Sequence, residues 1–276
     1  METVARAFAH QAGFTFHNKV GAGAFKETFL VSDAQGQIAL KVLGPNCSVA
    51  RTDREIEALR RCSHENIARL RDAVDFHFNG KTYRCLVEDY LGGGTLGDRL
   101  KLGLYPRDAL KTLGSGLIHA LEHLHGLGLV HRDIKPENVM YKAVESDQPV
   151  MVDFGLVRDL AASSITQSWF AQGPGTPLFA APEQLNNRKE LIDWRTDQFA
   201  VGVSLTFAFC GFHPHSLESD VGFECIDRVA GWQGPSERFR QAVGRIGMPS
   251  LEQMVSPYPV QRVRNPKKLL TTWQGY

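Results

Sequence analysis

The sequence has few cysteines, almost no net charge and no long apolar run. Its five cysteines form no C-x-x-C pair, so neither a zinc site nor a disulfide framework is indicated. The formal net charge is +1 with acids and bases interspersed, which gives no support for nucleic acid as a partner. The most apolar stretch, residues 199–212, contains two glycines and is too short to span a bilayer.

The N-terminal segment lacks the apolar core of a secretory signal, although it carries a basic residue, Arg6. We therefore expect a cytoplasmic location and no membrane partner. Internal repeats and low-complexity tracts are also absent. Nothing in the sequence indicates an oligomeric state.

The hydrophobic pattern changes near residue 90. With 276 residues and 43% hydrophobic content, the chain can form a two-lobed domain with a full core. Short alternating segments predict strands and one helix in the first lobe, whereas leucines recur at helical spacing in the second. These leucines are Leu110, Leu113, Leu117, Leu121 and Leu124. The pattern predicts an α+β protein with a strand-rich lobe followed by a helical lobe.

The segment H-R-D-I-K-P-E-N, residues 131–138, has the residue types needed for phosphoryl transfer. Asp133 can accept the proton of an attacking hydroxyl, and Lys135 can neutralise charge on the transferred phosphoryl group. Asn138 and Asp153 supply oxygen ligands, which suit Mg²⁺ or Mn²⁺ better than softer metals. Asp153 opens a D-F-G tripeptide twenty residues after Asp133, and the apolar runs between them predict two short strands that bring both acids to one edge.

These motifs resemble those of the eukaryotic-type (Hanks-type) protein kinases. The resemblance implies a bilobal fold, with a small antiparallel sheet carrying one helix and a larger, mainly helical lobe. It covers residues 13–272, divided into an N-lobe (13–89), a hinge (89–94) and a C-lobe (95–272), after a short extension (1–12). It also implies ATP and Mg²⁺, with Mn²⁺ as a possible substitute, and a protein substrate.

The glycine-rich hairpin of that family resembles V-G-A-G-A-F-K-E-T-F, residues 20–29. Gly21, Ala22 and Gly23 would let backbone amides approach the ATP phosphates, and Thr28 would lie against the adenine ring. Lys26 stands where the third glycine is usual. This lysine adds positive charge above the phosphates or restricts the loop.

The family's phosphate-binding lysine matches Lys41, in the apolar run I-A-L-K-V-L, with Ala39 above the adenine on the same strand face. Its glutamate partner on the following helix matches Glu55, with Glu57 as the alternative. The hinge resembles residues 85–96, so Asp89 and Leu91 are expected at the adenine edge together with Met140 from the C-lobe. Glu88 falls at the gatekeeper site behind the adenine, where a buried carboxylate would need a partner.

The activation segment resembles residues 153–183 and ends in G-T-P-L-F-A-A-P-E. In the family, a threonine at the position of Thr176 together with a lysine at that of Lys135 marks Ser/Thr specificity. The resemblance further pairs Glu183 with Arg262, and it places Asp197 against the catalytic-loop backbone. It also stacks four side chains through the domain: Leu59, Leu70, His131 and Phe154.

Arg132 beside the catalytic aspartate indicates control by phosphorylation of the activation segment. The usual acceptor position before Thr176 is occupied by Gln172 and Gly173, so the candidates are Ser163, Ser164, Thr166 and Ser168. In the alternative, Trp169 and Phe170 dock the segment without phosphate.

Two other classes of function stay open. A kinase-like binding scaffold usually lacks one of the catalytic residues, all of which are present here: Lys41, Glu55, Asp133, Asn138 and Asp153. A small-molecule kinase shares the H-x-D loop and typically lacks D-F-G and A-P-E. The sequence does not name the substrate protein.

Overall fold

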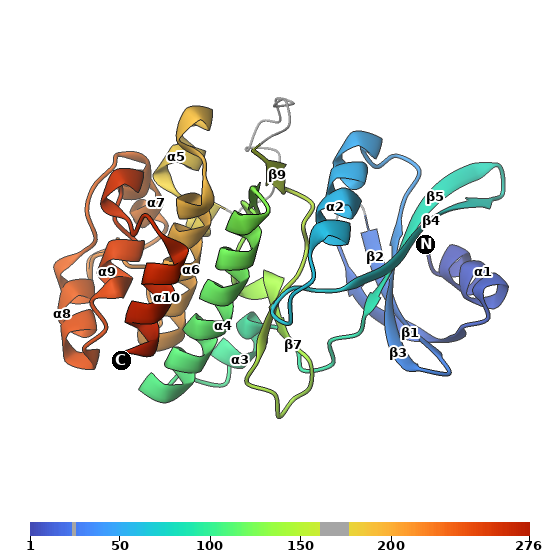
Figure 1. The fold of residues 1–276 in the computed structure, drawn as a ribbon, viewed down its shortest axis with the longest axis horizontal. Helices are drawn as coiled ribbons and strands as arrows, with labels where there is room; N and C mark the ends of the chain where they lie inside the picture. The colour runs from blue at the N-terminus through green and yellow to red at the C-terminus, as the bar shows by residue number, and fades with distance from the viewer. Residues whose placement is uncertain (24–25, 161–176) are drawn as a thin grey trace.

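The computed structural model describes residues 1–23, 26–160 and 177–276. A sheet-rich N-lobe and a helical C-lobe lie at opposite ends of the molecule (Figure 1). No helix in these ranges is both long and apolar enough to cross a membrane.

The N-lobe contains one antiparallel sheet in the order β1-β2-β3-β5-β4. Its strands are β1 (Thr15–Ala22), β2 (Lys26–Asp33), β3 (Gly36–Leu43), β4 (Leu70–Phe78) and β5 (Lys81–Asp89). Successive side chains along each strand point to opposite faces of the sheet. One face is apolar and fully buried, with Phe29 paired to Leu40 and Val31 paired to Ile38.

Helix α2 (Val49–Arg61) packs against the other face of the sheet. In this contact, Ile56 from the helix joins Leu43 and Leu86 from the strands. Glu55, on the buried side of the helix, is 4% exposed, whereas Glu57 is exposed. The burial pattern is therefore consistent with the choice of Glu55 over Glu57 made from the sequence.

Helix α1 (Glu2–Ala12) was not anticipated, since residues 1–12 were expected to be only a short extension. Val4, Ala5, Phe8 and Ala9 form its apolar side and join the buried face of the sheet. The ring of Phe8 meets Phe76 edge to face, with centroids 5.4 Å apart. The spacing of these four residues was the signal that could have revealed the helix.

The C-lobe begins with α3 (Leu96–Leu100) and α4 (Arg107–Gly126). The predicted leucine stripe lies on α4 and is at most 1% exposed at all five positions. Two short sheets follow, β6 (Leu129–Val130) with β9 (Arg158–Asp159), and β7 (Val139–Tyr141) with β8 (Pro149–Met151). The last pair confirms the two strands expected between Asp133 and Asp153.

The remaining helices complete the C-lobe. They are α5 (Pro182–Leu185), α6 (Trp194–Cys210), α7 (Glu224–Ala230), α8 (Glu237–Ile246), α9 (Ser250–Met254) and α10 (Pro266–Gln274). Of these, α6 and α10 pack against α4. Single 3₁₀ turns occupy Pro136–Asn138, Pro177–Phe179, Lys189–Leu191 and Pro259–Gln261. Trp273 of α10 lies against Gly114, where a Cβ atom would stand 2.2 Å from the indole ring. The buried α4 thus supports the segment that begins at His131.

Phe8→Ala should lower the free energy of unfolding of the N-lobe by about 3–5 kcal/mol, because it removes a buried ring from the contact between α1 and the sheet. Urea denaturation followed by far-UV circular dichroism would measure this loss. His10→Ala, on the exposed side of the same helix, is the matched control. Equal stability of the two variants would contradict a structural role for α1.

Candidate active site

The catalytic loop holds Asp133 between two side chains from its own segment. Lys135 Nζ lies 3.1 and 3.0 Å from the two carboxylate oxygens of Asp133. Asn138 Nδ2 donates to the backbone carbonyl of Asp133 at 2.8 Å and to its Oδ2 at 3.0 Å. The three side chains predicted to act together therefore lie in direct contact. Burial raises the pKa of Asp133, an effect that Lys135 partly offsets.

Asp197 of α6 fixes the start of this loop. Its carboxylate accepts the backbone N–H groups of His131 at 2.7 Å and Arg132 at 2.8 Å, as the sequence predicted. Burial raises the pKa of Asp197 to about 6, while the charge of His131 and the two backbone hydrogen bonds oppose that rise. Arg132 itself adopts a left-handed backbone conformation, with φ of 70°. A side chain in this region costs roughly 1–3 kcal/mol, which the contacts around Asp197 must offset.

The D-F-G tripeptide directs its aromatic ring into the core and its carboxylate toward the N-lobe. Phe154 is fully buried, and its ring centroid lies 4.7 Å from that of His131. Leu59 belongs to the same hydrophobic cluster, and Leu70 packs against it. The predicted contact of His131 with Phe154 is therefore present, and the continuation of the apolar column through Leu59 and Leu70 stays a prediction. Asp153, like Arg132, has a positive φ, 65°.

The carboxylate of Asp153 meets a lysine from the glycine-rich hairpin. Lys26 Nζ donates to Asp153 Oδ1 at 2.7 Å and lies 3.8 Å from Glu55 Oε1. Burial lowers the pKa of Lys26, but the charges of Asp153 and Glu55 outweigh it and leave the pKa raised. Burial raises the pKa of Glu55, and Lys26 counteracts this rise. Lys26, rather than Lys41, is the ion-pair partner of Glu55.

Lys41 pairs with Glu88, which corrects the predicted Lys41–Glu55 pair. Lys41 Nζ lies 2.7 Å from Glu88 Oε2, and both side chains are largely buried. The cause is strand register: Ala39 lies opposite Glu88 and Lys41 opposite Leu86, so both charges occupy one face of the sheet. The expectation that a gatekeeper carboxylate would need a partner is confirmed.

The residues predicted to contact adenine come from both lobes. Thr28 lies opposite Gly21 on β1 and opposite Lys41 on β3. Leu91 is buried in one cluster with Val150 and Val152, and Met140 packs against this cluster. Leu91 and Met140 therefore lie at one apolar cluster, and their contact with adenine stays a prediction.

The hinge passes close to the C-lobe backbone. A Cβ atom on Gly93 would lie 2.2 Å from the carbonyl oxygen of Ala143, so only glycine fits there. Asp89, at the end of β5, accepts a hydrogen bond from Arg71 Nε at 2.5 Å. The two lobes therefore meet closely at Gly93, and the side chain of Asp89 pairs with Arg71 of the N-lobe.

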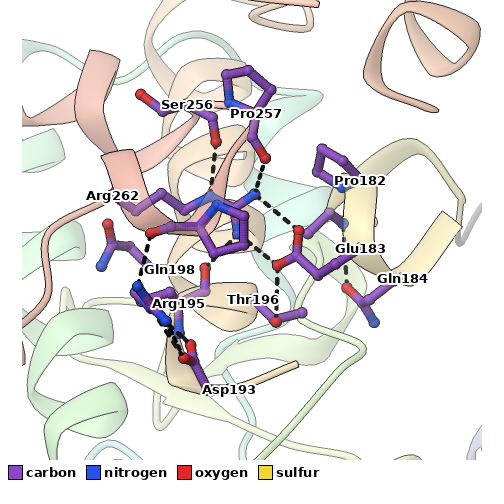
Figure 2. Close-up of polar contacts among 12 residues, drawn as sticks. Pro182, Glu183, Gln184, Asp193, Arg195, Thr196, Gln198, Ser256, Pro257 and Arg262 are labelled. Atoms are coloured by element: carbon purple, nitrogen blue, oxygen red, sulfur yellow. Dashed lines mark hydrogen bonds and ion pairs between the residues drawn. The ribbon is translucent and has the colours of Figure 1, made fainter. Parts of the chain in front are cut away.

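Glu183 and Arg262 form a fully buried ion pair below the end of the activation segment (Figure 2). Arg262 Nη1 and Nη2 donate to the two oxygens of Glu183 at 2.6 and 3.0 Å. Its remaining donors reach the backbone carbonyls of Ser256, Pro257 and Arg195. Thr196 adds a hydrogen bond to Glu183 at 2.9 Å. Every charge in this pair is compensated, as the resemblance predicted.

The oxygen donors at the junction of the lobes are few. Among the residues that the structure describes, no group of three or more His, Cys, Asp and Glu side chains is arranged to hold a metal ion. Asp153 and Asn138, beside Asp133, offer carboxylate and amide oxygens alone. Mg²⁺ typically takes one or two protein carboxylates and completes its shell with water and substrate phosphates. This donor set fits a Mg²⁺ ion bound together with a nucleotide.

Arg132 lies in a basic neighbourhood. Burial lowers the pKa of its guanidinium, and the charges of Arg158 on β9 and Arg54 on α2 lower it further. Its Nε atom is buried and has no hydrogen-bond partner among the residues that the structure describes. The predicted acceptors Ser163, Ser164, Thr166 and Ser168, and also Thr176, Trp169 and Phe170, lie outside the described residues.

Arg262→Ala should destabilise the C-lobe by about 3–5 kcal/mol, because it leaves the Glu183 carboxylate buried without its partner. Chemical denaturation would measure this change. Arg188→Ala is the matched control, since Arg188 pairs with Glu190 on the surface, where an ion pair contributes about 0–1 kcal/mol. Similar stability of the two variants would show that the buried pair does not anchor the segment.

Comparison with known proteins agrees with the site. Residues 14–233 match the protein kinase domain. Calcium/calmodulin-dependent protein kinase type 1B of Rattus norvegicus is 33% identical over 214 residues, which cover 75% of this chain and 59% of that protein. The Homo sapiens protein of the same name is 32% identical over the same shares. A protein named probable myosin light chain kinase from Dictyostelium discoideum is 32% identical over 213 residues, 74% of this chain and 65% of that protein.

The chain thus aligns with about three-fifths of the length of these relatives. The match to the domain extends from β1 to α7 and includes the hairpin, the catalytic loop, the D-F-G tripeptide and the Glu183 anchor. The chain belongs to the protein kinase domain family.

Proposed function

We propose that this chain is an ATP- and Mg²⁺-dependent protein kinase that phosphorylates serine and threonine hydroxyls on protein substrates. The observation that carries the proposal is the contact of Asp133 with Lys135 and Asn138 on a loop fixed by Asp197. This arrangement places the Asp133 carboxylate at hydrogen-bonding distance from the Lys135 ammonium group. Transfer of a phosphoryl group to a hydroxyl uses such a base beside a positive charge.

Each side chain has a distinct role in the proposed reaction. Asp133 orients the substrate hydroxyl and accepts its proton as the oxygen attacks. Lys135 offsets the negative charge that spreads over the transferred phosphoryl oxygens. Asp153 and Asn138 would hold Mg²⁺, which when bound neutralises phosphate charge and orients the phosphates. Gly21, Ala22 and Gly23 would bring the backbone of the hairpin close to the same phosphates, where the N–H of Gly23 donates to the carbonyl of Lys26 at 2.8 Å.

The adenine and the substrate are proposed to bind on opposite sides of this centre. The apolar surroundings of the base are supplied by Ala39 on β3, Thr28 on β2, Leu91 and Met140. The hydrogen bonds to the base come from the backbone at Asp89 and Leu91. Lys135 together with Thr176 supports serine and threonine as acceptors. The buried Glu183–Arg262 pair supports this assignment, because it anchors the segment that positions a peptide in the family.

Asp133→Ala should slow phosphoryl transfer by roughly 10² to 10⁴, because the general base is lost, while ATP affinity stays close to that of the wild type. Transfer of radiolabelled phosphate from ATP to a generic protein substrate measures the rate, and calorimetry measures nucleotide binding. Asp147→Ala removes the same charge from an exposed site and serves as the control. Near-normal turnover in the Asp133 variant would contradict the mechanism.

The same assay on the wild-type protein also distinguishes the proposed function from a binding scaffold and from a small-molecule kinase. A chain that binds nucleotide without transferring phosphate would be a binding scaffold. A chain that phosphorylates a small molecule and no protein would be a small-molecule kinase.

We further propose that phosphate on the activation segment controls activity, with Arg132 as its binding residue. The proposal is supported by the Nε atom of Arg132, which has no partner within residues 1–23, 26–160 and 177–276, and by the neighbouring charges of Arg54 and Arg158. A phosphoryl group carries about −1.5 to −2 charge and could pair with several guanidinium groups at once. The competing proposal is that Trp169 and Phe170 hold the segment by packing alone.

Incubation with Mg²⁺-ATP should add phosphate within residues 159–176, and subsequent phosphatase treatment should lower turnover. Mass spectrometry of proteolytic fragments locates the modified residue. Joint replacement of Ser163, Ser164, Thr166 and Ser168 by alanine should remove most of the activity. Full activity of that variant would favour the packing of Trp169 and Phe170.

A further inference from the structure

Two lysines of the N-lobe lie on the face of the sheet opposite α1. Lys26 and Thr28 are two residues apart on β2, and Thr28 lies directly opposite Lys41 on β3. Because side chains two apart share a face, Lys26 and Lys41 are diagonal neighbours on one side of the sheet. Either ammonium group could therefore reach a phosphate bound beneath the hairpin. The two lysines differ in the carboxylates with which they pair.

Lys41 is committed to a buried carboxylate. Glu88 is 2% exposed, and its Oε1 atom has no hydrogen-bond partner in the described part of the chain. Lys41, at 2.7 Å from Oε2, is therefore the contact that compensates its charge. If Lys41 moved to a phosphate, Glu88 would stay buried without a counter-charge. Breaking a buried pair in this way is strongly unfavourable.

Lys26 has the contacts that position a lysine at the nucleotide phosphates. It bridges Asp153, the predicted metal ligand, and Glu55 of α2, at 2.7 and 3.8 Å. Its side chain is 23% exposed, about twice the 12% of Lys41, so it can exchange one partner for a ligand at less cost. Its three N–H donors allow contact with phosphate oxygens while the charge of Glu55, 3.8 Å away, still attracts it.

We propose that Lys26, and not Lys41, is the lysine that contacts the nucleotide phosphates, with Glu55 as its positioning residue, and that Lys41 with Glu88 forms a structural pair behind the adenine. The inference rests on the proposed function, since it assigns a residue within the same nucleotide site. It also accounts for the lysine at the third position of the glycine-rich hairpin.

The ratio of ATP affinity to adenosine affinity tests this assignment, because only ATP has phosphates. Calorimetry would measure Kd for ATP with Mg²⁺ and for adenosine. In Lys26→Met the ratio should fall roughly 10- to 100-fold, the usual effect of losing a charged hydrogen bond, while adenosine still binds. In the double variant Lys41→Met/Glu88→Leu, which removes both charges together, the ratio should stay near that of the wild type.

Lys19→Met is the matched control, because Lys19 belongs to the same hairpin and pairs with Glu27 on the surface. It should leave both affinities unchanged. Thermal unfolding adds a second measurement: Lys41→Met alone should lower the melting temperature, and the added Glu88→Leu should restore most of it. Lys26→Met should melt close to the wild type.

The inference would be overturned by an unchanged ratio in Lys26→Met, or by a ratio that falls in the double variant. If the double variant does not fold, the Lys26→Met and Lys19→Met measurements still decide. These results are separate from failure of the proposed function. A wild-type chain that transfers phosphate while Lys26→Met keeps the full ratio would refute the role of Lys26 alone, whereas a wild-type chain that prefers adenosine would refute both.

Discussion

The buried carboxylate of Glu88 is the constraint on which the nucleotide side of this molecule depends. A carboxylate 2% exposed must find a positive partner, and strand register leaves Lys41 as the near one. Lys41 then acts on Glu55 and Asp153 only through its charge, which lowers the pKa of each against the opposing effect of burial. Lys26, carried on the neighbouring strand β2, makes the ion pairs with both carboxylates. The two lysines and three carboxylates thus form two sets of ion pairs, Lys41 with Glu88 and Lys26 with Glu55 and Asp153.

The buried carboxylates of the C-lobe are paired more completely than those of the N-lobe. Asp197 accepts two backbone N–H groups, and Arg262 satisfies Glu183 together with three carbonyls. These buried contacts hold the strained backbone at Arg132 and keep Asp133 in contact with Lys135. A loop held rigidly in this way suits the proposed centre for phosphoryl transfer.

The sequence predicted the C-lobe side of the site well, because the residues that act there are close along the chain. Asp133, Lys135 and Asn138 lie within one loop, and their contacts follow from that proximity. The ion pair of Glu183 with Arg262 was also predicted, although these residues are 79 positions apart, because the family motif supplied the pairing.

The N-lobe pairs could not be predicted in the same way. Lys41 has two acidic candidates, Glu55 on α2 and Glu88 on β5, and the choice depends on sheet register and burial. Neither property is visible from local spacing, so the resemblance alone suggested the wrong partner. Helix α1 was missed for a different reason, since its apolar stripe is short and precedes the family motifs.

The most direct test of the account is a crystal structure of the chain with Mg²⁺ and a non-hydrolysable ATP analogue. The account predicts Lys26 Nζ at hydrogen-bonding distance from phosphate oxygens, with Lys41 still paired to Glu88 and Asp153 and Asn138 as the protein ligands of the metal. Contact of Lys41 with the phosphates and with Glu55, and Lys26 turned to solvent, would contradict it.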